Sequence, residues 1–245
     1  MTKIVFLGVG GWISDPLLGY TSFVIVNSSG NWILVEAGEG VYGAMRKCGL
    51  QIDDNFKGVV ISHRHGDHVL GLPTLLQIAN HLGYRKMLIV SIDDVIEAIV
   101  ELLKASSSLN LLHLVDFIKI GFDKRVRVGD FEIEFLEAIH TTPAASIKII
   151  VDGKCIVYSG DTSYNPKLIE FARGCDILIH EASTYSEEAH RYGHSTYKDA
   201  INIAIKSNVK KLILIHFYLW PQPIKTPINE DLEILVPYPC QQINV

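Results

Sequence analysis

A short segment of the chain, residues 63–68, combines three histidines with one aspartate: His63, His65, Asp67 and His68. Imidazole and carboxylate groups together suit Zn²⁺, Mn²⁺ or Fe²⁺, and zinc is the commonest ion at nitrogen-rich sites. In an extended segment the first two histidines point the same way, so both could reach one ion. The other pair follows Gly66, where the chain can turn toward a second ion. The density of the cluster favours a metal site over a solvated polar loop.

Three further residues each follow a strand-like apolar run, as ligands from other loops should. His140 follows FLEAI, Asp161 follows IVYSG and His216 follows LILI. Taken alone, each is more commonly a hydrogen-bonded residue at a strand end, but their shared position favours a common site. A carboxylate between two cations can offset the charge of both. The residues therefore predict a centre for two divalent ions.

The segments between these residues predict the elements that must hold them. Apolar and β-branched runs predict strands at Ile4–Leu7, Ser22–Val26, Trp32–Val35, Val59–Ile61, Met87–Val90, Phe131–Leu136, Ser146–Val151, Cys155–Tyr158 and Asp176–Ile179. Helical spacing and end signals predict helices at Val41–Cys48, Leu72–His81 and Asp93–Lys104, and another that Ser195 or Thr196 caps and that runs to Lys206. The histidine cluster directly follows one of these strands.

Two stretches of the sequence repeat one pattern. SFVIVNSSGNWILVEAGEG and SIKIIVDGKCIVYSGDT both read as strand, turn, strand and an acidic glycine-containing loop, with a helix and another strand behind. This indicates one domain, 1–245, built from two similar halves of about 1–125 and 126–245. Sheet-forming halves with helices between their strands predict stacked sheets flanked by helices.

Composition narrows the classes of protein. Hydrophobic residues make up 48% of the chain and charged residues 20%, which argues against disorder. The net charge of −5 lacks the global basic signature of nucleic-acid binding, although a local basic patch is compatible with it. No apolar run approaches the ~20 residues of a membrane span, and the N-terminus does not read as a signal peptide. The four scattered cysteines form no C-x-x-C pair, so we expect reduced thiols and a cytoplasmic protein.

The order and spacing of the seven candidate ligands resemble those of metallo-β-lactamase fold hydrolases over nearly the whole chain. The resemblance implies an α+β fold, the αβ/βα four-layer sandwich of two stacked mixed β-sheets flanked by helices. It also implies two divalent ions, most commonly Zn²⁺, with Mn²⁺ and Fe²⁺ as alternatives. One ion would be held by His63, His65 and His140 and the other by Asp67, His68 and His216, with Asp161 bridging both.

Within that superfamily the chain resembles the ribonuclease Z-like branch. The carrying motifs are HRHGDHVLGLPTLL, GEG, SGDT, CDILIHEAST and GHST. The resemblance implies that His194 acts near the scissile phosphate and that Glu181 orients it. Asp67, which would lie beside the attacking water, is our candidate to accept a proton from it. The resemblance also implies a phosphodiester substrate and often a homodimer. The segment between His140 and Asp161 has no room for the arm with which that branch grips transfer RNA. RNA 3′ ends, cyclic nucleotides and other phosphodiesters stay open as substrates.

Other activities fit the same residues. A hydrolase of thioesters, lactones or β-lactams could use the same metal site, although the Glu181 and His194 pair favours phosphodiesters. A redox or non-catalytic metal-binding protein is the alternative of another class, and His65 argues against it because redox members usually carry Glu there. Aromatic residues near the motifs could stack on a base, line an acyl pocket or simply pack: Trp12, Tyr164, Tyr185, Tyr218 and Trp220.

Overall fold

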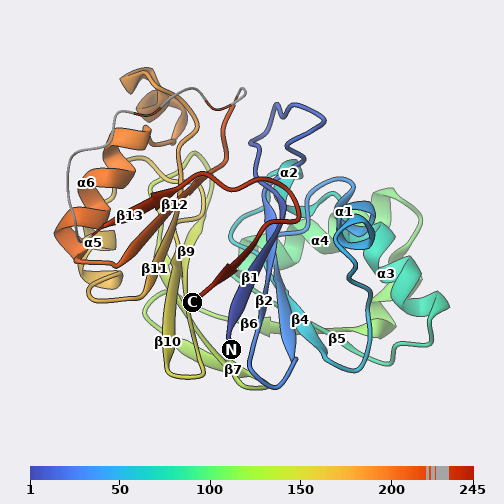
Figure 1. Cartoon of the computed structure of the whole chain (residues 1–245). Coiled ribbons are helices and arrows are strands. Elements are labelled where there is room, and N and C mark those ends of the chain that lie inside the picture. The colour runs from blue at the N-terminus through green and yellow to red at the C-terminus, as the bar shows by residue number, and fades with distance from the viewer. Residues whose placement is uncertain (219–220, 222–223, 225–231) are drawn as a thin grey trace.

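The strands form two seven-stranded sheets (Figure 1). The computed structural model describes residues 1–245 except 219–220, 222–223 and 225–231. The first sheet has the order β14–β1–β2–β3–β4–β5–β6, with bounds Gln242–Asn244, Lys3–Gly8, Ser22–Val26, Trp32–Val35, Phe56–Val60, Met87–Ser91 and Val115–Lys119. The second has the order β13–β12–β11–β10–β9–β8–β7, with bounds Glu233–Leu235, Lys211–Ile215, Ile177–Glu181, Lys154–Tyr158, Ala145–Val151, Phe131–Glu137 and Arg125–Val128.

Strand pairing repeats between the two sheets. From β1 to β6 the pairs are antiparallel, antiparallel, parallel, parallel and parallel, and from β8 to β13 they follow the same sequence. An antiparallel edge strand completes each sheet, β14 beside β1 and β7 beside β8. The two sheets thus share the same order of antiparallel and parallel strand pairs. The division of residues 1–245 into one domain with two similar halves stays a prediction.

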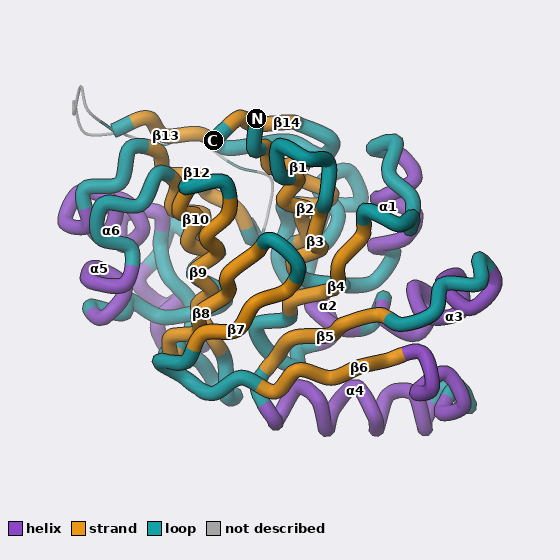
Figure 2. Tube along the Cα trace, turned by 90° about the horizontal axis from the view of Figure 1, so that it is seen from below, coloured by secondary structure: helices purple, strands orange, loops and turns teal. Residues whose placement is uncertain are grey.

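Helices cover the outer faces of the sheets (Figures 1 and 2). Beside the first sheet lie α1, α3 and α4 (Val41–Lys47, Leu72–His81 and Asp93–Ala105), and beside the second lie α5 and α6 (Lys167–Phe171 and Tyr197–Ser207). Between the sheets, the rings of Phe23 and Tyr158 meet edge to face at 5.3 Å within a core that draws buried side chains from both. The architecture confirms the predicted α+β, four-layer sandwich. The described helices include none with the length and apolar character of a membrane span.

Loops from the two sheets meet at the carboxyl ends of the parallel strands. The backbone N–H of Ala145 donates to the carbonyl of Ser62, and Gly11 donates to Phe217, at 3.1 and 3.0 Å. Chain ends of parallel strands carry loops that a rigid sheet holds in place. The predicted cap of α6 is also present, since Thr196 and Asp199 form a capping box. The site residues therefore lie on a fixed edge of the sandwich.

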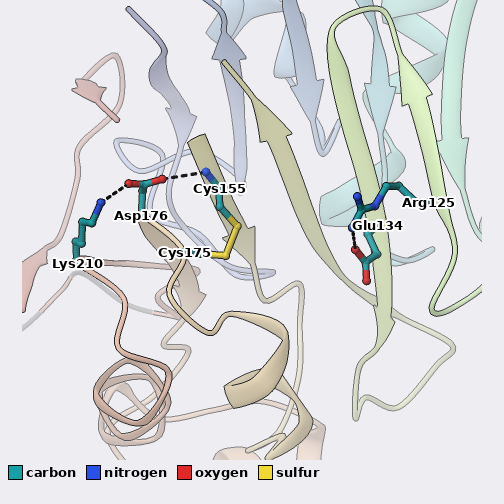
Figure 3. The surroundings of a disulfide bond; sticks show 6 residues. All are labelled: Arg125, Glu134, Cys155, Cys175, Asp176 and Lys210. Carbon is teal, nitrogen blue, oxygen red and sulfur yellow. Dashed lines mark hydrogen bonds and ion pairs between the residues drawn. A yellow bond between two sulfur atoms is a disulfide. The ribbon is translucent and has the colours of Figure 1, made fainter. Parts of the chain in front are cut away.

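The cysteines form disulfide bonds, so the expectation of reduced thiols was wrong. Cys48 pairs with Cys240 and Cys155 with Cys175, across Cα–Cα distances of 5.0 and 4.8 Å. The first bond joins the C-terminus of α1 to the segment before β14, and the second joins β10 to the start of its parallel neighbour β11 (Figure 3). The linear spacing conceals both pairs because the fold brings their partners together.

Candidate metal centre

Two groups of ligand atoms lie at this edge, and they share one carboxylate. His63, His65, His140 and Asp161 form the first group, in which all ligand atoms lie within 4.8 Å of one another. Nδ1 of His65 lies 3.1 Å from Nε2 of both His63 and His140. Oδ2 of Asp161 lies 3.6 Å from Nε2 of His63. Three imidazoles and a carboxylate could thus hold one ion.

The second group contains Asp67, His68 and His216 together with the same Asp161. Oδ2 of Asp161 lies 3.4 Å from Nε2 of His68 and 3.2 Å from Nε2 of His216. Oδ2 of Asp67 lies 3.3 Å from both of these nitrogens. The structure therefore brings together all seven residues that the sequence singled out as ligands, in the two predicted sets.

The polar atoms of this cluster fit a bound cation. Oδ1 of Asp161 and both ring nitrogens of His68 are buried and make no hydrogen bond within the described structure. Buried polar atoms without partners are costly, and a cation would satisfy them. A donor set of imidazole nitrogens and carboxylate oxygens is the set that zinc, manganese and iron accept. The residues present are therefore chemically suited to divalent metal.

Hydrogen bonds behind three of the histidines direct one ring nitrogen of each into the cluster. Nδ1 of His63 lies 2.9 Å from Oγ of Ser62, Nδ1 of His140 lies 2.7 Å from the carbonyl of Gly193, and Nδ1 of His216 lies 2.9 Å from Oγ of Ser183. The carbonyl can only accept, so His140 carries its proton on Nδ1 and presents the Nε2 lone pair to a metal. We assign the same tautomer to the other two from the same geometry.

The pKa shifts of the histidines also favour the binding of a cation. Burial lowers the pKa of His63, His65 and His140, so these rings stay neutral and keep a lone pair. Burial alone would also lower the pKa of His68, but the carboxylates of Asp67 and Asp161 raise it well above its usual range. A cation held by this second group would therefore displace a proton from His68.

Glu36 supports the second group from behind, which the sequence did not reveal. Its carboxylate is completely buried, accepts the backbone N–H of Ser62 at 3.3 Å, and lies 3.4 Å from Nδ1 of His68. Carboxylates behind metal-binding histidines fix ring orientation and raise ligand basicity. The sequence feature that could have indicated this role is the position of Glu36, an acidic residue at the end of a predicted strand and immediately before AGEG.

His194 and Glu181 lie together beside the shared carboxylate. Nδ1 of His194 lies 2.9 Å from Oε1 of Glu181 and 3.9 Å from Oδ2 of Asp161. Burial lowers the pKa of His194, but the Glu181 carboxylate more than offsets this, and the pKa is raised to about 9. Ser183, which sequence reasoning missed, donates its hydroxyl proton to Oε2 of Glu181 at 2.7 Å and connects this pair with His216. A protonated imidazole thus faces the cluster.

A cavity of about 680 Å³ adjoins the cluster. Its lining includes His65, Asp67, His140, Asp161 and His194, and also the aromatic residues Trp12, Tyr192 and Tyr218. None of its described lining residues is Lys or Arg. Three other aromatic residues lie near the sequence motifs. Tyr164 and Tyr185 pack against a second hydrophobic cluster, which lies around α5 and α6, and Trp220 lies outside the described residues.

Comparisons with known proteins agree with this geometry. The model of the family "Anti-Pycsar protein Apyc1" matches residues 2–230. Ribonuclease Z of Picrophilus torridus is 31% identical over 284 aligned positions, which cover 95% of this chain and 91% of that protein. The zinc phosphodiesterase ELAC protein 2 homolog of Caenorhabditis elegans is 28% identical over 88% of this chain and 32% of its own length. The metallo-β-lactamase fold protein YhfI from Bacillus subtilis superposes with a TM-score of 0.83 at 21% identity, over the full length of both chains.

Proposed function

Since the chain belongs to the Anti-Pycsar protein Apyc1 family and is a metal-dependent phosphodiesterase of the ribonuclease Z type, we propose that it hydrolyses nucleotide-sized phosphodiesters, with cyclic nucleotides as the favoured class. The predicted resemblance to the ribonuclease Z-like branch of metallo-β-lactamase fold hydrolases is confirmed. RNA 3′ ends are the second candidate substrate, since the Picrophilus relative is named as a ribonuclease.

The observation that carries the choice of substrate is the cavity beside the cluster. Its volume of about 680 Å³ lies within the range of small-ligand sites, roughly 300–1,000 Å³. RNA binding draws most of its affinity from Lys and Arg contacts to phosphates, and the described lining contains neither residue. Between His140 and Asp161 the chain forms only the β9–β10 hairpin, which Asp152 and Gly153 close, in the place of an RNA-gripping arm. These features favour a small substrate.

We assign two divalent ions to the centre, with Zn²⁺ first and Mn²⁺ or Fe²⁺ as alternatives. His63, His65 and His140 would hold one ion, Asp67, His68 and His216 the other, and Asp161 both. When bound, the ions would supply Lewis acidity toward the phosphoryl oxygens and lower the pKa of a water molecule.

The chain's own residues would move the protons. Burial raises the pKa of Asp67, but His68 and His216 outweigh this and hold it well below its usual range, so the carboxylate is ionised. Bound cations would favour the same ionised form, and Asp67 would accept a proton from water whose own pKa they have lowered. His194, protonated beside Glu181, can donate a proton to the leaving oxygen or stabilise charge on the phosphate. The two catalytic groups thus start in opposite protonation states.

We further propose that the protein is cytoplasmic, since its N-terminus does not read as a signal peptide, and that it forms a homodimer, on the strength of the family resemblance. The two disulfides count against a strongly reducing compartment, whereas the intracellular proteins of hyperthermophiles keep such bonds. Trapping of free thiols during cell lysis measures which state the four cysteines hold in the cell.

A substrate panel combined with metal analysis tests the function. We expect 2′,3′- or 3′,5′-cyclic nucleotides and bis-p-nitrophenyl phosphate to be hydrolysed, chelation to stop the reaction, and Zn²⁺ or Mn²⁺ to restore it. Precursor transfer RNA, a thioester, a lactone and a chromogenic β-lactam complete the panel. Cleavage of the precursor at its 3′ end, faster than that of cyclic nucleotides, would transfer the assignment to RNA. Hydrolysis of the thioester, lactone or lactam alone would transfer it to the other hydrolase class.

A further inference from the structure

Three aromatic side chains at the cavity are left in solvent by the fold. Trp12, Tyr192 and Tyr218 are 58%, 68% and 37% exposed, and all three line the cavity beside the metal cluster. The rings of Trp12 and Tyr218 stack on each other, with centroids 6.3 Å apart and an interplanar angle of 29°. Exposed large apolar groups that gather at a cavity mark a binding surface more often than a packing role.

The fold fixes the Trp12–Tyr218 pair relative to the ligand His216. Gly11 donates its N–H to the carbonyl of Phe217 at 3.0 Å, and a Cβ on Gly11 would lie 3.1 Å from the His216 ring. Tyr218 donates its own N–H to the carbonyl of Ser183 at 3.0 Å. The two loops that carry the aromatic pair are therefore attached to the same segment as a metal ligand.

Tyr192 is attached to the centre from a different element. It is the last residue of the short 3₁₀ helix Glu187–Tyr192 and is followed by Gly193 and His194. The carbonyl of Gly193 accepts the Nδ1 proton of His140. Aromatic rings thus reach the cavity from two separate parts of the chain, each beside a residue of the catalytic cluster.

Charge distinguishes the metal cluster from the rest of the cavity lining. Outside the predicted site residues, Glu188 is the only charged residue in its described lining. A carboxylate repels phosphate but accepts hydrogen bonds from hydroxyl and amino groups. The phosphodiester therefore belongs at the metal cluster, and the ribose and base belong against the aromatic residues and Glu188 of the same lining.

We propose that Trp12, Tyr192 and Tyr218 form a stacking subsite that binds the base of a nucleotide substrate. The inference rests on the proposed phosphodiesterase function and adds what sets its specificity. Stacking uses the π-face that every base has, so it tolerates different bases. The subsite selects nucleosidic diesters over diesters without a base, and discriminates weakly between purines and pyrimidines.

Steady-state kinetics of leucine variants test the subsite. Trp12→Leu, Tyr192→Leu and Tyr218→Leu keep apolar bulk but remove the π-face, whereas Trp12→Phe keeps an aromatic ring. The substrates are the four ribonucleoside 3′,5′-cyclic phosphates and ribose 3′,5′-cyclic phosphate, which lacks a base. Tyr238→Leu is the matched control, since Tyr238 is 65% exposed and is not among the residues that line the cavity. Product formation is followed by ³¹P NMR, with metal content measured for each variant.

We expect each leucine variant to raise KM for the cyclic nucleotides by about ten-fold, since one base–aromatic stack is worth roughly 1–3 kcal/mol. Turnover number, metal content and kinetics on ribose cyclic phosphate should stay at wild-type values. Trp12→Phe should raise KM less than Trp12→Leu does, because a ring remains, and Tyr238→Leu should behave as wild type. Unchanged KM in all three leucine variants would overturn the subsite, as would equal wild-type kcat/KM with and without a base. Failure of the proposed function looks different, because the wild-type protein would then hydrolyse neither the cyclic nucleotides nor ribose cyclic phosphate at a significant rate.

Discussion

The two halves of the sandwich share one hydrogen-bonding arrangement at the carboxyl ends of their parallel strands. In the first half the side chain of Glu36, just after β3, accepts the N–H of Ser62, just after β4, at 3.3 Å. In the second half Oγ of Ser159, just after β10, accepts the N–H of Glu181, at the end of β11, at 2.9 Å. A side chain after one strand thus fixes the exit of the next strand in both sheets.

The segments at these two strand ends carry different functional residues. The first leads into the loop that carries His63, His65, Asp67 and His68, and so provides most of the candidate metal ligands. The second delivers Glu181, which holds His194 beside the cluster. Equivalent strand exits therefore carry four of the seven candidate ligands in the first half and the Glu181–His194 pair in the second, while His140, Asp161 and His216 of the second half complete both groups. The side chains that follow the strands decide the chemistry, while the pairing pattern decides only where they meet.

Asp161→Ala gives the largest effect we expect, because this carboxylate joins the contributions of the two halves. Its loss leaves the histidines of both groups without the shared negative charge. Metal content should fall well below about two ions per chain, and diester hydrolysis should become undetectable. Elemental analysis and ³¹P NMR measure both, with the surface variant Asp116→Ala as control. Full metal content at the full rate would refute the assignment of the centre.

His194→Asn tests whether the second half supplies the proton. We expect metal content to persist and the rate on a diester with an alkoxide leaving group to fall by about 10²-fold or more. A p-nitrophenolate leaving group departs without protonation, so the same variant should lose much less on p-nitrophenyl esters. Glu181→Gln should follow the same trend more weakly. An equal loss on both substrates would mean that His194 does not act as the acid.

The candidate ligands could be predicted from sequence because they are chemically distinctive. Histidines and aspartates at the ends of apolar runs indicated the candidate ligand set, and apolar, β-rich runs predicted strands such as Trp32–Val35 at their observed bounds. The short edge strands β13 and β14, three residues each, were missed because so few residues carry no periodicity. Residues that act through tertiary contacts were missed too: Glu36, Ser183, Tyr192 and the cysteine pairs.

Glu36→Gln and Ser159→Ala compare the two side chains that accept these backbone N–H groups, one in each half. The glutamine oxygen can still accept the N–H of Ser62, but the negative charge beside His68 is lost. We expect the metal affinity of the second group to fall by about 10- to 100-fold, as is usual for residues behind a ligand. Ser159→Ala should leave metal affinity unchanged and lower the free energy of unfolding by roughly 1 kcal/mol. Competition with a chromogenic chelator and denaturant titration separate the two effects, and equal affinity losses would contradict the proposed division.

The opposite ends of the same strands contrast as well, with smaller consequences. In the first half the rings of Trp32 and Phe56 lie 4.5 Å apart, and the indole N–H contacts Asp53 at 3.3 Å. In the second half the Cys155–Cys175 bond takes that place beside Asp176, which accepts the N–H of Cys155 at 3.0 Å (Figure 3). Aromatic packing in one sheet thus corresponds to a covalent bond and a charged contact in the other.

Asp176→Asn removes only the charge of that contact and should have the smallest effect. Burial raises the pKa of Asp176, but hydrogen bonds from Lys210 and from the Cys155 N–H outweigh this and lower it. A lowered pKa in the folded state stabilises the protein above the unfolded value of about 3.9, and this contribution disappears as the pH falls through the folded value. At pH 7 the variant should lose less than about 1 kcal/mol, since solvent screens the exposed Lys210. Urea unfolding of the metal-free proteins should show this difference at neutral pH and its loss in acid, whereas Asp53→Asn should show neither, because Asp53 pairs with no cation among the described residues. A difference that persists in acid would assign the loss to packing around the disulfide rather than to the charge.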